Sequence, residues 1–130
     1  MVIDSSALIA ILLDEPEANA FLRAIHTSPR CRISAATFLE TGMILRRDAT
    51  GQRQQRFERL ISSLRISIVP VTEQQARTAL DAFGLYGKGR GHRASLNFGD
   101  CLAYALAKVS AEPLLFKGND FSETDIQAAI

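Results

Sequence analysis

The chain has almost no net charge, because 15 Lys and Arg residues face 14 Asp and Glu residues and leave +1 in 130 residues. This balance gives no global signature of a polyanion-binding protein, so any contact with nucleic acid must be local. The chain also lacks the charge excess of a disordered protein, and its 47% of hydrophobic residues suffice for a core. It contains no repeat, linker or low-complexity segment. We therefore expect one domain over residues 1–130.

Long apolar runs and cysteine motifs are missing as well. The apolar stretch at residues 2–13 contains Asp4, has no basic start and is shorter than the ~20 residues that span a bilayer. We therefore expect a soluble, cytoplasmic protein without membrane contact. The two cysteines, Cys31 and Cys101, follow no metal-ligand or redox spacing and lie in apolar segments. This pattern predicts reduced thiols in the core.

Short apolar runs alternate with helical patterns along the chain. Runs typical of buried strands occupy residues 1–4, 31–34, 66–71 and 114–116. Helical patterns occupy about 7–13, 15–26, 35–47, 52–63, 72–83 and 100–110. This alternation predicts an α/β fold with a short, mainly parallel central sheet of four to five strands and helices on both faces.

Four carboxylates lie beside apolar segments and not in the polar stretches where acids normally collect. Asp4 and Asp120 directly follow predicted strands, and Asp100 begins a predicted helix. Glu40 lies on the second turn of another helix, with apolar residues one turn before and one turn after it. All four side chains are therefore expected to lean toward the interior. Because ligands collect at the carboxyl ends of parallel strands, we expect the four to converge on one cleft.

Such a cluster needs a cation. Two unit charges about 4 Å apart repel by roughly 4 kcal/mol at an effective dielectric of about 20, so carboxylates gather only around a cation or shared protons. Oxygen ligands with room for water suit Mg²⁺ or Mn²⁺. Taken alone, Asp4 could be a helix cap, Asp100 a helix-start acid and Asp120 a turn residue. Glu40 has no such ordinary role, although a nearby arginine could neutralise it.

Five segments, taken in order along the chain, match the sequence pattern of a known protein family. They are MVIDSSAL at 1–8, FLE at 38–40, LNFGDCLAYALA at 96–107, LLFKGNDF at 114–121 and TDI at 124–126. Together they resemble the PIN-domain ribonucleases of VapC type, over the whole chain and at fitting intervals. The stretches around Asp100 and from 116 to 121 are the most specific. The resemblance implies a three-layer α/β/α fold and the toxin of a bacterial toxin–antitoxin pair.

The resemblance also assigns roles to individual residues. It implies that Asp4 and Asp100 bind the metal, that Glu40 and Asp120 complete the acidic cluster, and that Ser6 positions water or phosphate. One ion, or two about 3.5–4 Å apart, would then activate water for in-line attack on an RNA phosphate. Implied partners are RNA, a cognate VapB-like antitoxin, and a second copy in a homodimer or in a toxin–antitoxin hetero-oligomer.

RNA phosphates also need cationic neighbours, and the glycine-rich loop from 84 to 91 with its extension to 93 is the best candidate. The residues predicted to bind substrate are Lys88, Arg90 and Arg93, with His92 beside them. The pair Arg46 and Arg47 comes next. A solvated, flexible loop without a binding role is the ordinary alternative.

Two other functions fit parts of the sequence. A phosphoacceptor receiver domain shares the chain length, an early acid and a lysine, Lys117, after a late strand. It requires an aspartate at the end of its third strand, however, and ISIVP at 66–70 has none. A PIN-like domain that has lost activity and serves as a binding module is the second alternative. The intact acids argue against it.

Overall fold

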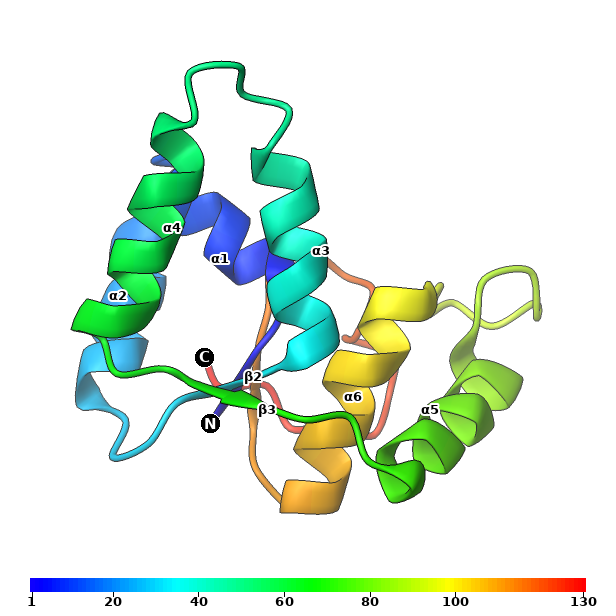
Figure 1. The fold of residues 1–130 in the computed structure, drawn as a ribbon. Helices are drawn as coiled ribbons and strands as arrows, with labels where there is room; N and C mark the ends of the chain where they lie inside the picture. Colours follow the sequence, from blue (N-terminus) through cyan, green and yellow to red (C-terminus); the bar gives the residue numbers. More distant parts are fainter.

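The chain folds into a parallel sheet flanked by helices, as seen in a computed structural model that describes residues 1–130 (Figure 1). The strands are β1 (Val2–Ile3), β2 (Arg32–Ser34), β3 (Ser67–Val69) and β4 (Leu114–Leu115). The helices are α1 (Ser5–Leu12), α2 (Ala18–Thr27), α3 (Ala35–Leu45), α4 (Gln52–Ser63), α5 (Glu73–Tyr86) and α6 (Phe98–Ser110). The strand order is β3-β2-β1-β4, and every pairing is parallel. The predicted α/β fold is confirmed.

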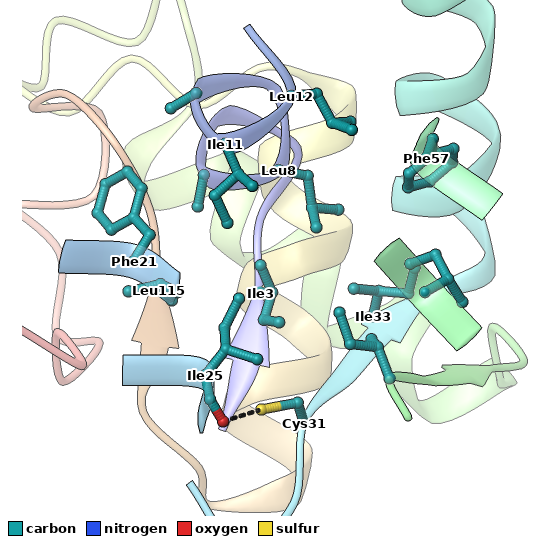
Figure 2. Close-up of a cluster of buried hydrophobic side chains, with 14 of the residues drawn as sticks. Ile3, Leu8, Ile11, Leu12, Phe21, Ile25, Cys31, Ile33, Phe57 and Leu115 are labelled. Carbon is teal, nitrogen blue, oxygen red and sulfur yellow. Dashed lines mark hydrogen bonds between the residues drawn. The ribbon is translucent and has the colours of Figure 1, made fainter. Parts of the chain in front are cut away.

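Two hydrophobic cores lie on opposite faces of the sheet, because successive strand residues point to opposite sides. Ile3 and Leu115 belong to the core formed with α1, α2 and α4. Val2 and Leu114 belong to the core formed with α5 and α6. Figure 2 shows the first core, in which side chains of α1, α2 and α4 surround Ile3. The sheet is therefore the middle of three layers.

Two helix boundaries differ from the sequence prediction. Helix α6 begins at Phe98 with Asn97 as its cap, so Asp100 is the third helical residue and not the first. Helix α5 continues through Gly84 and ends at Tyr86. A glycine inside a helix costs only about 1 kcal/mol relative to alanine, and the surrounding turns offset that loss.

Both cysteines are buried free thiols, as predicted. Cys31 donates a weak hydrogen bond from its sulfur to the Ile25 carbonyl at 3.7 Å, which is drawn in Figure 2. Cys101 lies within α6. No helix in the chain combines the length and the apolar content that crossing a membrane requires.

Leucine truncations should separate the core from the surface. Leu8 of α1 has no exposed surface and Leu85 of α5 is 63% exposed. Leu8→Ala is expected to lower the free energy of unfolding by about 2–5 kcal/mol, because it removes buried carbon atoms and leaves a cavity. Leu85→Ala should change it by less than about 0.5 kcal/mol. Urea unfolding followed by circular dichroism measures both, and equal losses would contradict the assignment of Leu8 to the core.

Candidate active site

The candidate site lies where the strand order reverses. From β1 the chain builds β2 and β3 on one side of the sheet, and β4 is later added on the other side. Asp4 directly follows β1, and residues 116–120 directly follow β4. The first turns of α1 and α6 lie at the same end, because α1 begins directly after β1 and α6 packs along the sheet and ends just before β4 begins. A crevice at such a switch point is the usual ligand site of an open parallel sheet.

Asp4 is held in place by the start of α1. Its Oδ2 atom accepts hydrogen bonds from the Ser6 backbone N–H at 2.9 Å and from the Ser6 hydroxyl at 2.6 Å. The Ser6 hydroxyl in turn accepts a bond from the Lys117 backbone N–H at 2.9 Å, which ties the loop after β4 to α1. The other carboxylate oxygen, Oδ1, is buried and has no hydrogen-bond partner. Burial raises the pKa of Asp4, so this orphaned oxygen suits a cation.

Asp100 is fixed by a capping box at the start of α6. Its Oδ2 atom accepts the Asn97 backbone N–H at 2.8 Å, and its own N–H donates to Asn97 Oδ1 at 3.0 Å. Burial raises the pKa of Asp100 to about 7, and the charges of Asp4, Asp120 and Glu40 act in the same direction against the Asn97 hydrogen bond. In the absence of a cation, Asp100 therefore titrates near neutral pH.

Glu40 reaches from α3 to the first turn of α6. A β-carbon at Gly99 would lie 2.7 Å from Glu40 Oε1 and closer still to Oε2, so the carboxylate rests directly on the Gly99 backbone. Burial raises the pKa of Glu40, the charge of Asp4 adds to this shift, and the Ser5 side chain opposes it. Sequence reasoning missed the part played by Gly99. Its only signal was its place beside Asp100 in the FGD run.

Two expectations about the acids are wrong. Asp120 is exposed and does not lean inward, because it lies in a surface turn after Gly118. Met43 and Ile44, the apolar residues one turn beyond Glu40, are 63% and 39% exposed and do not face the core. The buried face of α3 is formed instead by Thr37, Thr41 and Leu45. Periodicity identifies a stripe on a helix but does not say which stripe meets the sheet.

The four acids influence one another without forming a closed ligand set. Asp4 raises the pKa of Glu40 and of Asp100, and Asp120 raises the pKa of Asp4 and of Asp100. No three His, Cys, Asp or Glu side chains come close enough together to enclose a metal ion as they stand. The side chains thus share one neighbourhood, while hydrogen bonds within the chain hold one oxygen each of Asp4 and Asp100.

Comparison with known proteins identifies the family, since the family model of the PIN domain matches residues 1–127. The chain belongs to the PIN-domain family. It is 46% identical over 130 residues to Ribonuclease VapC28 of Mycobacterium tuberculosis and to VapC ribonuclease Mb0625 of Mycobacterium bovis, which covers 100% of this chain and 98% of each relative.

Solved structures share the fold of this PIN domain. Mycobacterium tuberculosis VapC20, described as a Sarcin-Ricin loop cleaving toxin, superposes with a TM-score of 0.76 at 16% identity, over 96% of this chain and 95% of that one. A toxin–antitoxin complex from Klebsiella pneumoniae gives a TM-score of 0.70 at 19% identity, over 95% and 92%. VapBC2 from Rickettsia felis, bound to a fragment of its promoter DNA, gives 0.70 at 15%, over 98% and 94%.

The basic residues predicted to bind substrate lie on the connection between α5 and α6. Lys88, Arg90 and Arg93 are all exposed. The base of the loop is closed by a hydrogen bond from the Lys88 backbone N–H to the Leu96 carbonyl at 3.0 Å, and the Arg90 guanidinium lies 5.7 Å from the centre of the Phe83 ring. Figure 1 shows this loop leading directly into the first turn of α6. The loop therefore adjoins the end of α6 that carries Asp100.

A receiver-like phosphoacceptor domain does not fit the geometry of this PIN domain. The Lys117 ammonium group is not free for a phosphoryl group, because it pairs with Glu15 at 2.6 Å and with Glu17 at 3.1 Å. The third strand ends at Val69, which Pro70 follows, so no acid stands there.

The raised pKa of Asp100 predicts how stability depends on pH when divalent ions are removed. The folded pKa of about 7 lies above the unfolded value of about 3.9, so the folded state binds the proton more tightly. Stability from this group is therefore complete below about pH 4 and is lost as pH rises through 7. Asp100→Asn should raise the thermal midpoint clearly more at pH 8 than at pH 5.

Asp81→Asn is the matched control, because Asp81 is an exposed acid on α5. It should shift the midpoint by the same small amount at both pH values. Thermal unfolding in a chelator measures the four midpoints. A gain for Asp100→Asn that is no larger at pH 8 than at pH 5 would contradict the burial of a charged Asp100.

Proposed function

We propose that residues 1–130 act as one PIN domain and that it is a metal-dependent endoribonuclease, the toxin component of a toxin–antitoxin pair. The observation that carries this proposal is the juxtaposition of Asp4 and Asp100, two buried acids of raised pKa at the switch point of the sheet. The ribonucleases that are 46% identical over the whole chain support RNA as the substrate.

A divalent cation fits the residues present. Asp4 offers a buried carboxylate oxygen without a hydrogen-bond partner. The other acids nearby also offer carboxylate oxygens as ligands, and oxygen ligands suit a hard ion such as Mg²⁺ or Mn²⁺. In our proposal Asp4 and Asp100 hold the ion, and Glu40 and Asp120 bind it or its water shell. When bound, the ion supplies a water of lowered pKa and neutralises charge that develops on the phosphate.

The residues of the chain position the reactants. The Ser6 hydroxyl proton already goes to Asp4, so its role in our proposal is to orient Asp4 and not to bind phosphate. Glu40, resting on Gly99, holds attacking water by hydrogen bonding. The exposed Asp120, at the rim of the site, orients water or helps to hold a second ion. The loop with Lys88 and its neighbouring arginines binds phosphates next to the scissile one.

Protein partners are part of the same proposal. A toxin must be inactive in its own cell, so we propose a VapB-like antitoxin, and a homodimer or a toxin–antitoxin hetero-oligomer as the assembled form. The solved toxin–antitoxin complexes that share this fold support such an assembly. The chain also exposes an apolar groove of about 730 Å³ between α3, α5 and α6, lined by ten hydrophobic residues. Exposed apolar surfaces of this kind mark protein contact sites.

Asp4→Asn and Asp100→Asn test the proposed activity directly. Each should lower the rate of RNA cleavage in Mg²⁺ by about a hundred-fold or more, since a bound metal stabilises the transition state by several kcal/mol. In cells, induced wild type should arrest growth and create new RNA 5′ ends, which sequencing detects. Asp81→Asn is the control and should behave as wild type. Growth arrest and new ends that persist in both site variants would favour an inactive binding module.

Gly99→Ala tests how Glu40 is positioned. The added methyl group would occupy the space of the Glu40 carboxylate, which is the end of a flexible side chain and can move away. We therefore expect normal folding by circular dichroism and about tenfold or greater loss of kcat, because displaced water-orienting groups lose catalytic power. Gly84→Ala is the matched control, since a β-carbon there meets nothing within 4 Å. Equal kcat values for the two variants would contradict this role of Gly99.

A further inference from the structure

Positive charge is concentrated in one stretch of this nearly neutral chain. Residues 46–59 contain five arginines and only two acids, Asp48 and Glu58, a net charge of +3 in a protein whose total is +1. The rest of the chain is therefore net −2. The five residues, called the arginine surface below, are Arg46, Arg47, Arg53, Arg56 and Arg59, and all are exposed.

The acids of this stretch do not neutralise it. Asp48 is engaged by its own turn, where it accepts bonds from the Thr50 hydroxyl and from the backbone N–H groups of Thr50 and Arg53. The hydrogen bond from the Thr50 hydroxyl contributes most to lowering the pKa of Asp48. The positive charge of Arg53 also lowers this pKa, although the two side chains form no ion pair. Glu58 accepts a bond from Gln54 at 3.2 Å.

Only one member of the arginine surface forms an ion pair. Arg56 bonds to both oxygens of Asp14, at 2.7 and 2.8 Å, and to the Leu12 carbonyl at 2.9 Å. These bonds tie α4 to the end of α1. The other four guanidinium groups lie within ion-pair distance of no acid. They are therefore available to an external anion, and a guanidinium suits phosphate because it offers paired N–H donors.

Three of the arginines form a row. Arg53, Arg56 and Arg59 recur every third residue on α4, so neighbours are about 4.5 Å apart along the axis and the outer two about 9 Å. They line one hollow of about 370 Å³, closed on the other side by Leu12, Leu13 and Asp14. Because five of its seven lining residues are polar or charged, the hollow lacks the apolar centre of a protein contact site. A row of phosphates fits it better.

The three arginines of the row lie beyond the acidic site, at the far end of α1. Helix α1 covers about 12 Å between Asp4 and the hollow, since it has eight residues. Arg46 caps the end of α3 and Arg47 follows it, so both arginines lie beyond the end of the helix that carries Glu40. Figure 1 shows α1, α3 and the start of α4 extending toward the same end of the molecule. A strand with one phosphate at the acids can continue along this direction.

We propose that the arginine surface binds the RNA backbone beyond the cleavage position and supplies affinity without taking part in the chemistry. This inference rests on the proposed ribonuclease function. It adds a phosphate-binding site on α4 that lies on the opposite side of α3 from the loop with Lys88 and Arg90. The preferred substrate is therefore an RNA strand that is long enough to contact the acids and the arginine-lined hollow at the same time.

The test compares Arg53→Gln/Arg59→Gln with Arg23→Gln/Arg65→Gln, which removes the same charge from exposed arginines of no assigned role. Arg56 is kept because it ties α4 to α1. Binding of a 20-nucleotide oligouridylate is measured from 50 to 200 mM salt in an Asp100→Asn background that prevents cleavage. Each phosphate contact on a single strand contributes about 0.7 to the salt slope. The first double variant should lose about 1.4 from the slope and bind roughly tenfold more weakly at 50 mM, and the second should match the parent.

Arg53→Lys/Arg59→Lys keeps the charges and should keep most of the slope. The proposal is overturned if the glutamine variant retains the slope and affinity of its control. It is equally overturned if that variant binds oligouridylate normally and loses affinity for the cognate antitoxin, because the surface then serves a protein. Failure of the ribonuclease function itself is recognised separately, since wild type would then neither bind this RNA nor cleave total RNA in Mg²⁺.

Discussion

Repulsion between carboxylates at the carboxyl ends of β1 and β4 is the constraint on which the rest of this molecule depends. Asp4 and Asp100 are both buried, and the charge of Asp4 raises the pKa of Asp100 and of Glu40. Two unit charges about 4 Å apart at an effective dielectric of about 20 repel by roughly 4 kcal/mol, which is a large share of the stability of a small domain. The chain holds the acids there with bonds from Ser6 and Asn97, and it leaves Asp4 Oδ1 open to a cation.

The fold supplies the means to hold these groups together. Asp4 caps α1 and Asp100 lies in the first turn of α6, and at both places backbone N–H groups and the helix dipole favour negative charge. The two hydrophobic cores hold α1 and α6 on opposite sides of the sheet, and the chain order brings both helix starts to the end of the sheet where β1 ends. The bond from the Lys117 N–H to Ser6 then joins the last strand's loop to the first helix. Packing energy from the cores thus offsets the electrostatic cost of the site.

Sequence and structure agree where local chemistry decides and differ where packing decides. The predicted strands and the capping role of Asp4 are confirmed, because capping and strand patterns are local. The inward lean of Asp120 and a buried setting for the apolar neighbours of Glu40 are wrong, because the orientation of a turn and the buried face of α3 depend on the elements packed against them. Gly99 was missed for the same reason, since its importance comes from a side chain 59 positions away.

By itself, the sequence determined the α/β class, the parallel sheet and the identity of the acids, since strand periodicity, helix caps and acid placement are all written in neighbouring residues. Only the tertiary structure decided which of those acids are buried, which oxygen lacks a partner, how Glu40 rests on Gly99 and where α4 lines up its arginines. Burial and distance between remote residues depend on how two cores pack against one sheet. No local pattern carries that information.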